Sequence, residues 1–333
     1  MKVGKVTGNA LKRSVLKQVV PTEYGKEIIS GAALGADCAF LACPQDAKAA
    51  ACVQEAAVAT KADMELLVGR CANSIAAGGA KPVAALLGLI LPESVEEPEL
   101  KDLTRTAREA CEAYGMQIVG GHTTVSRAVS CPFAALTVWG RLTLDQETSR
   151  RQRKAAHGQD IVISKWIGLE GTALLAKSYK ERLEQRYPAY LVEEAAGFDR
   201  YMSVLKEAEI AAQAGACAMH DASEGGILAA LWELAESAGT GLTIDLKKLP
   251  IRQETVEVCE CLGANPYELR SGGCLIMTAE DGEALKEALW EAQIPAVVVG
   301  KLTQGKERLI LNEEEVRYMD RPQVDEIYRF LDC

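Results

Sequence analysis

Segments with strand-like and helix-like hydrophobic patterns alternate along the whole of this 333-residue chain, and this alternation restricts the folds open to it. The apolar run 83–91 is about half as long as a membrane span of ~20 residues and is typical of a buried strand. From Glu99 to Tyr114, apolar residues recur at spacings of three and four, which predicts a helix that stops at Gly115. The same succession returns after residue 157. The sequence therefore predicts an α/β (α+β) fold in both halves.

Ten further segments carry the same two kinds of pattern. Strands are expected at 116–119, 133–139, 160–164, 216–219, 274–278 and 297–302, and helices at 171–177, 204–213, 227–238 and 284–293. The polar, charged stretch 143–157 is typical of a linker. With a length that suits two domains, the sequence predicts one domain over residues 1–148 and a second over residues 155–333.

The charge balance restricts the partners of the chain. Lys and Arg number 37 and Asp and Glu number 47, so the formal net charge is −10. Nonspecific binding to nucleic acid or to an anionic membrane needs a basic surface, so neither partner is expected. A nucleotide remains compatible with this charge, because a local site or a metal ion can neutralise its phosphates.

The cysteines and the N-terminus indicate the compartment. The 11 cysteines are scattered and form no CxxC pair, which gives no support to a zinc ribbon or a thioredoxin-like motif. Residues 1–17 are polar and basic and lack the apolar core of a secretory signal. We therefore expect a cytoplasmic protein in which most cysteines are small core residues.

The strongest cluster of polar residues and glycines is the run 220–226. There a buried strand leads into a predicted helix through Asp221, Ser223, Gly225 and Gly226. Because the N-terminus of a helix favours anions, this run predicts a phosphate-binding loop. Simple capping of the helix by Asp221 or Ser223 is the alternative.

Two weaker clusters lie in the first half. Asp37 lies two residues after Gly35 and is a candidate ligand for a divalent cation, although a Gly-x-Asp sequence also forms plain turns. Asn73 and Ser74 lie off the apolar stripe of a segment that follows Asp63, where a solvated helix face is the alternative to a site.

A further cluster, residues 120–124, comes after a predicted strand. It offers backbone N–H groups, two hydroxyls and His122, which is either structural or a ligand of metal or phosphate.

Taken in order, these clusters resemble motifs of the PurM-like aminoimidazole-ribonucleotide synthase superfamily, and the hydrogenase maturation (HypE) branch fits best. The matching stretches are GADCA at 35–39 (family G-x-D-A-A), ANSIAAGGAKP at 72–82 (V-N-D-L-A…G-A-x-P), VGGHT at 119–123 (G-G-D-T), WIGLEGT at 166–172 (G-L-E-G-T) and MHDASEGG at 219–226 (M-H-D-P-T-R-G-G). Together they cover nearly the whole chain.

The resemblance implies two PurM-like domains, of which the N-terminal one binds ATP with Mg²⁺ and pairs with a second copy in a homodimer. By match, Asp37 and Asp63 would be Mg²⁺ ligands. The residues that would line the nucleotide are Asn73, Gly120 and Gly121 from the N-terminal domain and Ser223, Gly225 and Gly226 from the C-terminal domain.

The implied chemistry is the ATP-dependent activation of an amide or carboxylate oxygen on a small molecule or a protein thiol. Within this resemblance His122, Asp221 and Cys333 are the candidate catalytic residues. Cys333 qualifies because HypE chains end in a cysteine that carries a carbamoyl group.

Several positions depart from the family pattern. Ser74 and His122 stand where the family has acidic residues, and Thr124 and Gly272 stand where HypE has the lysine and the glutamate of its dehydration chemistry. Three functions therefore stay open: an ATP-dependent enzyme with altered metal ligation, a nucleotide-binding scaffold without catalysis, and ATP-dependent dehydration of a carbamoyl group on Cys333.

The end of the chain bears on the third function. The apolar residues Val324, Ile327, Tyr328 and Leu331 predict an amphipathic helix that would hold Cys333 in place.

Overall fold

The structure, a computed structural model, describes residues 4–5, 10–19, 26–31, 40–42, 47–143 and 154–330. Asp37, Leu331 and Cys333 lie outside these residues, as does most of the predicted linker. The chain divides into two compact units, one of residues 1–76 and 80–147 and the other of residues 77–79 and 148–333. Among the described helices, none has both the length and the apolar character that crossing a membrane requires.

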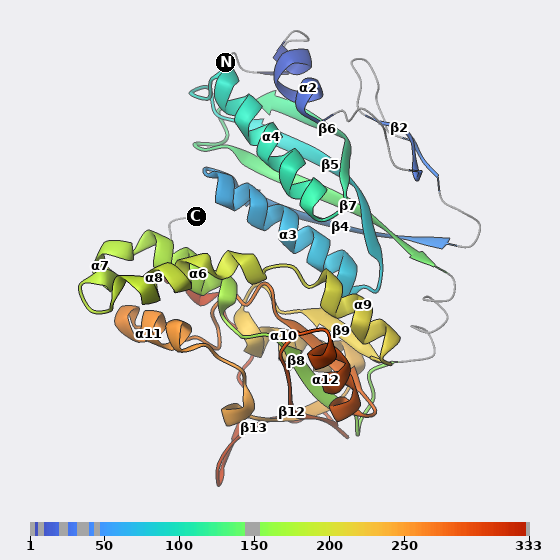
Figure 1. Cartoon of the computed structure of the whole chain (residues 1–333), viewed down its shortest axis with the longest axis vertical. Helices are drawn as coiled ribbons and strands as arrows, with labels where there is room; N and C mark the ends of the chain where they lie inside the picture. Colours follow the sequence, from blue (N-terminus) through green and yellow to red (C-terminus); the bar gives the residue numbers. More distant parts are fainter. Residues whose placement is uncertain are drawn as a thin grey trace. The chain divides into compact units, whose positions relative to one another are not determined.

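The first unit is built on a five-stranded sheet in the order β1-β6-β5-β7-β4 (Figure 1). Its strands are β1 (Gly4–Lys5), β4 (Ala47–Ala57), β5 (Lys81–Leu91), β6 (Gln117–Val125) and β7 (Phe133–Thr143). The pair β5–β6 is parallel, whereas β7 runs antiparallel to both β5 and β4. A parallel pair needs a crossover connection, and the predicted helix between these strands supplies it.

Helices cover one face of this sheet. They are α3 (Lys61–Ala77) and α4 (Glu97–Ala113), and α4 in turn carries the short helical turns η1 (Leu11–Leu16) and α2 (Lys17–Val19) (Figure 1). The contact with η1 is polar, since the Thr104 hydroxyl donates to the Ser14 carbonyl oxygen at 2.6 Å. A small two-stranded sheet, β2 (Ile28–Ser30) with β3 (Phe40–Leu41), completes the described part of the unit.

The opposite face of the sheet carries several exposed apolar side chains. Val53 of β4 is 59% exposed, and Leu86 and Ile90 of β5 are 42% and 38% exposed. Val53 and Leu86 both pair with Thr137 of β7, so these residues share one face. We call Val53, Leu86 and Ile90 the open sheet face.

The second unit holds a seven-stranded sheet in the order β14-β13-β10-β12-β8-β11-β9, in which only β10 and β13 are parallel neighbours. Its strands are β8 (Asp160–Ser164), β9 (Ala218–Asp221), β10 (Gly241–Asp245), β11 (Leu275–Ala279), β12 (Ala296–Thr303), β13 (Arg308–Asn312) and β14 (Glu315–Tyr318).

Both faces of its central strands are covered. Ile161 and Ile163 of β8 pack in one apolar core with helix α10 (Gly226–Ala238). Val162, which points to the other face, is also fully buried, on the side of helices α9 (Leu205–Gln213) and α12 (Gly282–Glu291).

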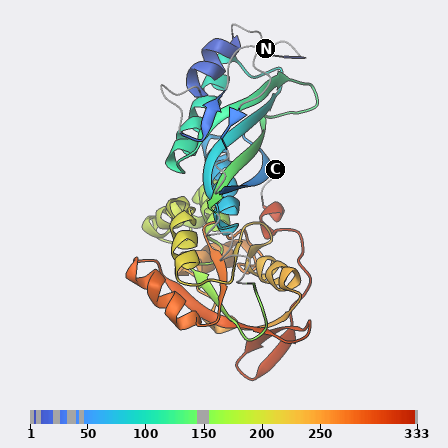
Figure 2. The same ribbon diagram turned by 90° about the vertical axis from the view of Figure 1, so that its right-hand side faces the viewer.

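A helical lobe packs beside this sheet (Figure 2). It has its own core around Leu175, Val192 and Val258. The lobe comprises α6 (Leu169–Ser178), α7 (Lys180–Glu184), α8 (Ala189–Ala196), η2 (Gly197–Tyr201) and α11 (Gln253–Leu262), and the turns η3 (Leu246–Lys248) and η4 (Glu326–Arg329) complete the unit.

Two expectations from the sequence are wrong in detail. Strand β6 does not stop at residue 119 but continues through residues 120–124, because these residues pair with β5 as far as Leu91. The amphipathic helix predicted near the end of the chain is only the single turn η4, in which Ile327 is buried, while Val324 is 77% exposed.

Candidate functional site

Of the two glycines of β6, Gly121 is required by the close approach of β5. A Cβ on Gly121 would lie 1.9 Å from the carbonyl oxygen of Leu87, at a φ of 152° that side chains rarely adopt. A Cβ on Gly120 would lie 2.9 Å from Cδ2 of Leu86. The strand pairing alone therefore accounts for glycine at position 121, whether or not a nucleotide binds there. At position 120 the neighbour is the end of the exposed Leu86 side chain, which can move aside.

His122 and Asn73 lie on different sides of the sheet. His122 pairs with Gly88 and is exposed on the same face as Leu86, since successive residues of a strand alternate between faces. Asn73 belongs to α3, which covers the other face. The structure therefore does not bring these two predicted site residues together.

Asn73 is only 2% exposed, so the alternative of a solvated helix face is wrong for this residue. The neighbouring Ser74 is half-buried, and its hydroxyl accepts a 3.0 Å hydrogen bond from Nε2 of Gln54 on β4. At the position where the family has an acidic residue, this chain thus has a hydroxyl that is engaged in packing α3 on the sheet.

Asp63 caps helix α3. Its Oδ2 accepts from the backbone N–H of Thr60 at 2.7 Å and from the Thr60 hydroxyl at 2.8 Å, and the Asp63 N–H donates to the Thr60 hydroxyl at 3.3 Å. This reciprocal arrangement is a capping box. Among the residues that the structure describes, no three His, Cys, Asp or Glu side chains gather as metal ligands. Asp63 is thus engaged in the cap, and Asp37, the other predicted Mg²⁺ ligand, lies outside the described residues.

In the second unit, Gly225 and Gly226 join β9 to α10, both with a left-handed backbone at φ of 78° and 71°. A Cβ on Gly226 would lie 2.5 Å from the carbonyl oxygen of Tyr267. The glycine pair thus lets the first turn of α10 pack against the backbone at 267–268. The loop itself is held from behind, because the Ser223 carbonyl oxygen accepts from the N–H of Ser271 at 3.1 Å.

A carboxylate from the end of the described chain closes this loop. Oδ2 of Asp325 accepts from the Gly225 N–H at 2.6 Å, and its Oδ1 accepts from the Ile327 N–H at 2.9 Å. Burial raises the pKa of the Asp325 carboxyl, against the opposing effect of these two hydrogen bonds and of the Arg270 guanidinium. The N-terminus of α10 therefore already has an anion bound to it, supplied by the chain itself.

Arg270 is the centre of the charged cluster behind the loop. Its guanidinium nitrogens lie 3.7 Å from carboxylate oxygens of Glu170, Glu224 and Asp325. Its Nη2 also donates to the Tyr328 hydroxyl at 2.7 Å, which links the residues around η4 to the loop. One buried cation thus faces three carboxylates, two of which are buried as well.

Glu170 also decides what can stand at position 272. A Cβ on Gly272 would lie 2.2 Å from Oε2 of Glu170. The position that matches the HypE glutamate therefore has no room for a side chain unless Glu170 moves.

Asp221 ends β9 with both carboxylate oxygens shielded from solvent. It lies near the Cys274 thiol, whose pKa is raised by burial and further by this carboxylate, against the lowering effect of Lys165. Lys165 itself forms a buried 2.5 Å ion pair with Glu207. Both carboxylate oxygens of Asp221 are therefore enclosed at the end of β9, and its role as a candidate catalytic residue stays a prediction.

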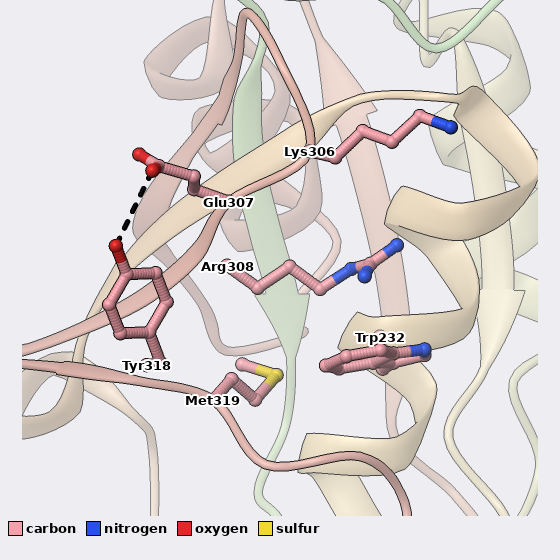
Figure 3. A pocket seen from close by; sticks show the side chains of 6 residues that line it. All are labelled: Trp232, Lys306, Glu307, Arg308, Tyr318 and Met319. Carbon is pink, nitrogen blue, oxygen red and sulfur yellow. Dashed lines mark hydrogen bonds between the residues drawn. The ribbon is translucent and has the colours of Figure 1, made fainter.

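The second unit also contains a cavity of about 290 Å³ between α10 and the β13–β14 hairpin (Figure 3). The Arg308 guanidinium lies over the Trp232 ring, 3.9 Å from its centroid, with Met319 beside it (Figure 3). None of the predicted site residues lines this cavity, whose walls are Trp232, Lys306, Glu307, Arg308, Tyr318 and Met319.

Sequence reasoning missed the roles of Arg270 and Asp325. Arg270 faces Glu170, which stands in the G-L-E-G-T stretch, so that motif was a usable signal for this charged cluster. Nothing in the sequence near Asp325 resembles a motif. Its part in the loop depends on a contact across 100 residues, which no local pattern reports.

Comparison with known proteins assigns the family. Residues 35–142 match the AIR synthase related protein N-terminal domain, and residues 156–312 match the AIR synthase related protein C-terminal domain. The chain belongs to the AIR synthase related protein family. This confirms the resemblance to the PurM-like superfamily and the prediction of two PurM-like domains.

Among relatives in this family, the carbamoyl dehydratase HypE of Rhodobacter capsulatus is 30% identical over 212 residues, 64% of this chain and 60% of that protein. The thiamine-monophosphate kinase of Pyrococcus horikoshii is 24% identical over 248 residues, 73% of this chain and 72% of that protein. The chain thus spans about 60% of the length of the HypE relative.

The fold agrees over a longer range. The crystal structure of Escherichia coli HypE, a hydrogenase maturation protein, matches with a TM-score of 0.76 at 20% identity, covering 96% of this chain and 99% of that chain. A structure of HypE in complex with ATP matches with a TM-score of 0.76 at 19% identity, covering 96% of each chain. At this level of identity the matches establish a shared fold.

Proposed function

We propose that this protein binds ATP and uses it to activate an amide or carboxylate oxygen, as a HypE-like member of its family. The observation that carries the proposal is the loop 223–226, which joins β9 to the N-terminus of a 13-residue helix in a chain that matches both AIR synthase related domains. Aligned backbone dipoles and N–H groups at such a helix end favour phosphate. The Gly225 N–H is bonded to the Asp325 carboxylate in this structure, so the phosphates of ATP would have to displace that carboxylate to bind there.

Asp221 has a supporting role in this proposal. Its carboxylate is shielded from solvent near the Cys274 thiol at the end of β9, whereas Ser223 offers a hydroxyl within the loop itself. Magnesium arrives as the complex of ATP, in keeping with the usual chemistry of phosphoryl transfer.

A second candidate function is nucleotide binding without turnover. Specific observations favour it: Asp63 caps α3, Ser74 is bonded to Gln54, and Gly272 lies against Glu170 with no room for a side chain. Each of these positions corresponds to a site residue in the family pattern, and here each is engaged in packing or lacks a functional group.

Dehydration of a carbamoyl group on Cys333 ranks third. The segment before it is docked, since the Tyr179 hydroxyl donates to the Phe330 carbonyl oxygen at 2.7 Å. Three further residues reach about 10 Å at full extension. While this contact holds, Cys333 can take part only in a reaction at a site within about that distance of Phe330.

Calorimetry and turnover measurements on the full chain distinguish the first two candidates. Titration with ATP and Mg²⁺ measures binding, and phosphate release in the presence of small amides and carboxylates measures turnover. The variant Asp221→Ala should lose turnover, whereas Asp281→Ala, which removes the cap of α12 at a comparable helix end, should keep it. Binding without turnover selects the second candidate, and absence of ATP binding contradicts both.

Mass spectrometry tests the third candidate. The thiol of Cys333 is first carbamoylated, and ATP should then remove one water from that adduct. An adduct that keeps its mass in the presence of ATP contradicts the candidate.

We further propose that two copies pair through the open sheet face. Its three exposed apolar side chains lie on one surface of the sheet, and burying such surface favours association. Leu86→Glu should give a monomer in sedimentation equilibrium. Val316→Glu changes a comparably exposed side chain, 58% against 42%, and should leave the assembly intact. A wild-type chain that is monomeric at high concentration contradicts the pairing.

A further inference from the structure

Two cysteines of the first unit meet between strand β4 and helix α3. The Sγ of Cys52 lies 3.4 Å from the carbonyl oxygen of Cys71 and donates to it. Cys52 and Gln54 share the strand face that is turned toward α3, because residues two apart in a strand point the same way. Cys71 is fully buried, and its own thiol donates to the Leu136 carbonyl oxygen at 3.5 Å.

We propose that Cys52 is an oxidation site, and that peroxide converts Cys52 and Cys71 into a disulfide that joins β4 to α3. This modification is independent of the ATP chemistry proposed above, because neither thiol belongs to that site.

The two thiols differ in the way that such a reaction requires. Cys52 is half-buried and lies on β4, the edge strand of the sheet, so a small oxidant can reach it. The side-chain interaction with Cys71 lowers the pKa of Cys52, which favours its nucleophilic thiolate form. The same interaction, together with burial, raises the pKa of Cys71, so Cys71 is the partner that keeps its proton.

The reaction balances with hydrogen peroxide as the oxidant. The Cys52 thiolate attacks one peroxide oxygen, the O–O bond breaks, and the departing hydroxide takes up a proton to leave as water. The product is a sulfenic acid at Cys52. The Cys71 sulfur then attacks the Cys52 sulfur, the S–O bond breaks, and the departing hydroxide takes the Cys71 proton. Overall, two thiols and one peroxide give one disulfide and two waters.

A third thiol lies nearby but is unsuited to the reaction. Cys111 on α4 is fully buried, and burial raises its pKa to about 12. It is therefore protonated and shielded from the oxidant, so we expect it to remain reduced.

The bond would change how α3 is held. Cys52 and Cys71 are 19 positions apart, so the cross-link closes a short loop and restricts the unfolded chain. It would also fasten the helix that carries Asn73 and Ser74 to the edge of the sheet. We expect a rise in the Tm of the first unit of roughly 5–10 °C, reversed by dithiothreitol.

The test is a peptide map of the full chain after treatment with hydrogen peroxide. Trypsin cleaves after Lys48 and Arg70, so Cys52 and Cys71 fall in separate peptides that begin at residues 49 and 71. Under non-reducing conditions these two peptides should appear as one species that has lost two hydrogen masses. Dithiothreitol should separate them.

Variants complete the test. Cys52→Ala should abolish both the linked species and the rise in Tm, whereas Cys131→Ser, another half-buried thiol of the first unit, should keep both. A Cys52 that proceeds to sulfinic acid without a linked peptide, or that links to any other cysteine, overturns the proposal. If Cys71→Ala, a change in the core, does not fold, the peptide map of the wild-type protein still shows whether the disulfide forms.

Discussion

The backbone N–H of Gly225 donates a 2.6 Å hydrogen bond to the carboxylate of Asp325, which lies 100 positions further along the chain. The contact joins the loop before α10 to the turn η4. It places an internal anion where the sequence predicts a bound phosphate, so the loop and the end of the described chain form one structural unit.

Removing that carboxylate should destabilise the second unit. In Asp325→Ala the N–H groups of Gly225 and Ile327 lose their acceptor, which we expect to lower the free energy of unfolding by about 2 kcal/mol. Urea denaturation measures the loss, and limited proteolysis should show earlier cleavage near residue 325. Asp320→Ala removes an exposed carboxylate nearby and should change neither readout. Equal effects of the two variants would contradict this role.

Protonation of Asp325 should make stability depend on pH in a defined direction. Because its pKa in the folded protein is raised above the ordinary 3.8, the folded state binds the proton more tightly than the unfolded state does. The resulting stabilisation is complete below pH 3.8 and is lost as the pH rises through the raised pKa. The free energy of unfolding of wild type, relative to Asp325→Asn, should therefore increase from neutral pH toward pH 3.8. A difference that stays constant or shrinks is the contrary outcome.

Gly121 should tolerate no side chain. In Gly121→Ala the new Cβ would meet the backbone of Leu87, which cannot move without breaking the β5–β6 pairing, and we expect a loss of at least about 3 kcal/mol. Gly88→Ala is the matched control in the partner strand, since its Cβ would make ordinary contacts of 3.5 Å and 3.7 Å with Ala135. Thermal unfolding of the two variants compares them directly. A mild effect at Gly121 would mean that the strands are spaced further apart.

A variant at Asp63 distinguishes capping of α3 from metal binding. If it acts only as the capping residue of α3, Asp63→Ala should cost about 1 kcal/mol, and the cost should be the same with and without Mg²⁺. Melting curves of wild type and variant in Mg²⁺ and in a chelator test this. Stabilisation by Mg²⁺ that appears in wild type and vanishes in the variant would instead make Asp63 a metal ligand.

The buried pair of Lys165 and Glu207 should show strong coupling. Lys165→Met leaves a buried carboxylate without its cation, which typically costs about 3–5 kcal/mol. The double variant Lys165→Met/Glu207→Leu removes both charges and should cost less than Lys165→Met alone. Chemical denaturation of the three chains gives the coupling, and simple additivity would speak against it.

The hydrophobic periodicity of the sequence was sufficient to predict most of the helices and strands. The helix expected from Glu99 is α4, and the segment 160–164 is strand β8 with the same bounds, because an amphipathic stripe or a fully apolar run is a local property. The end of β6 was not predictable in this way. Residues 120–124 look like a loop in sequence, and only the pairing with β5 keeps them in the strand.

The candidate site was predictable only as a set of positions. The motif at 219–226 correctly marks the start of α10, but the inward carboxylate of Asp221 and the closure by Asp325 depend on tertiary contacts. Burial of Asn73 is a similar case, since its place off the apolar stripe left a site and a solvated helix face as alternatives, whereas packing around α3 encloses it.

The 100 positions between Gly225 and Asp325 also delay the synthesis of the acceptor relative to the donor. At ~5–20 residues per second, ribosomes need roughly 5–20 s to synthesise the 100 residues between donor and acceptor. During that interval the Gly225 N–H lacks its native acceptor, and the contacts of the loop with Tyr267 and Ser271 can form earlier, since those residues are synthesised earlier. The bond to Asp325 is thus among the last contacts of this loop that synthesis makes available.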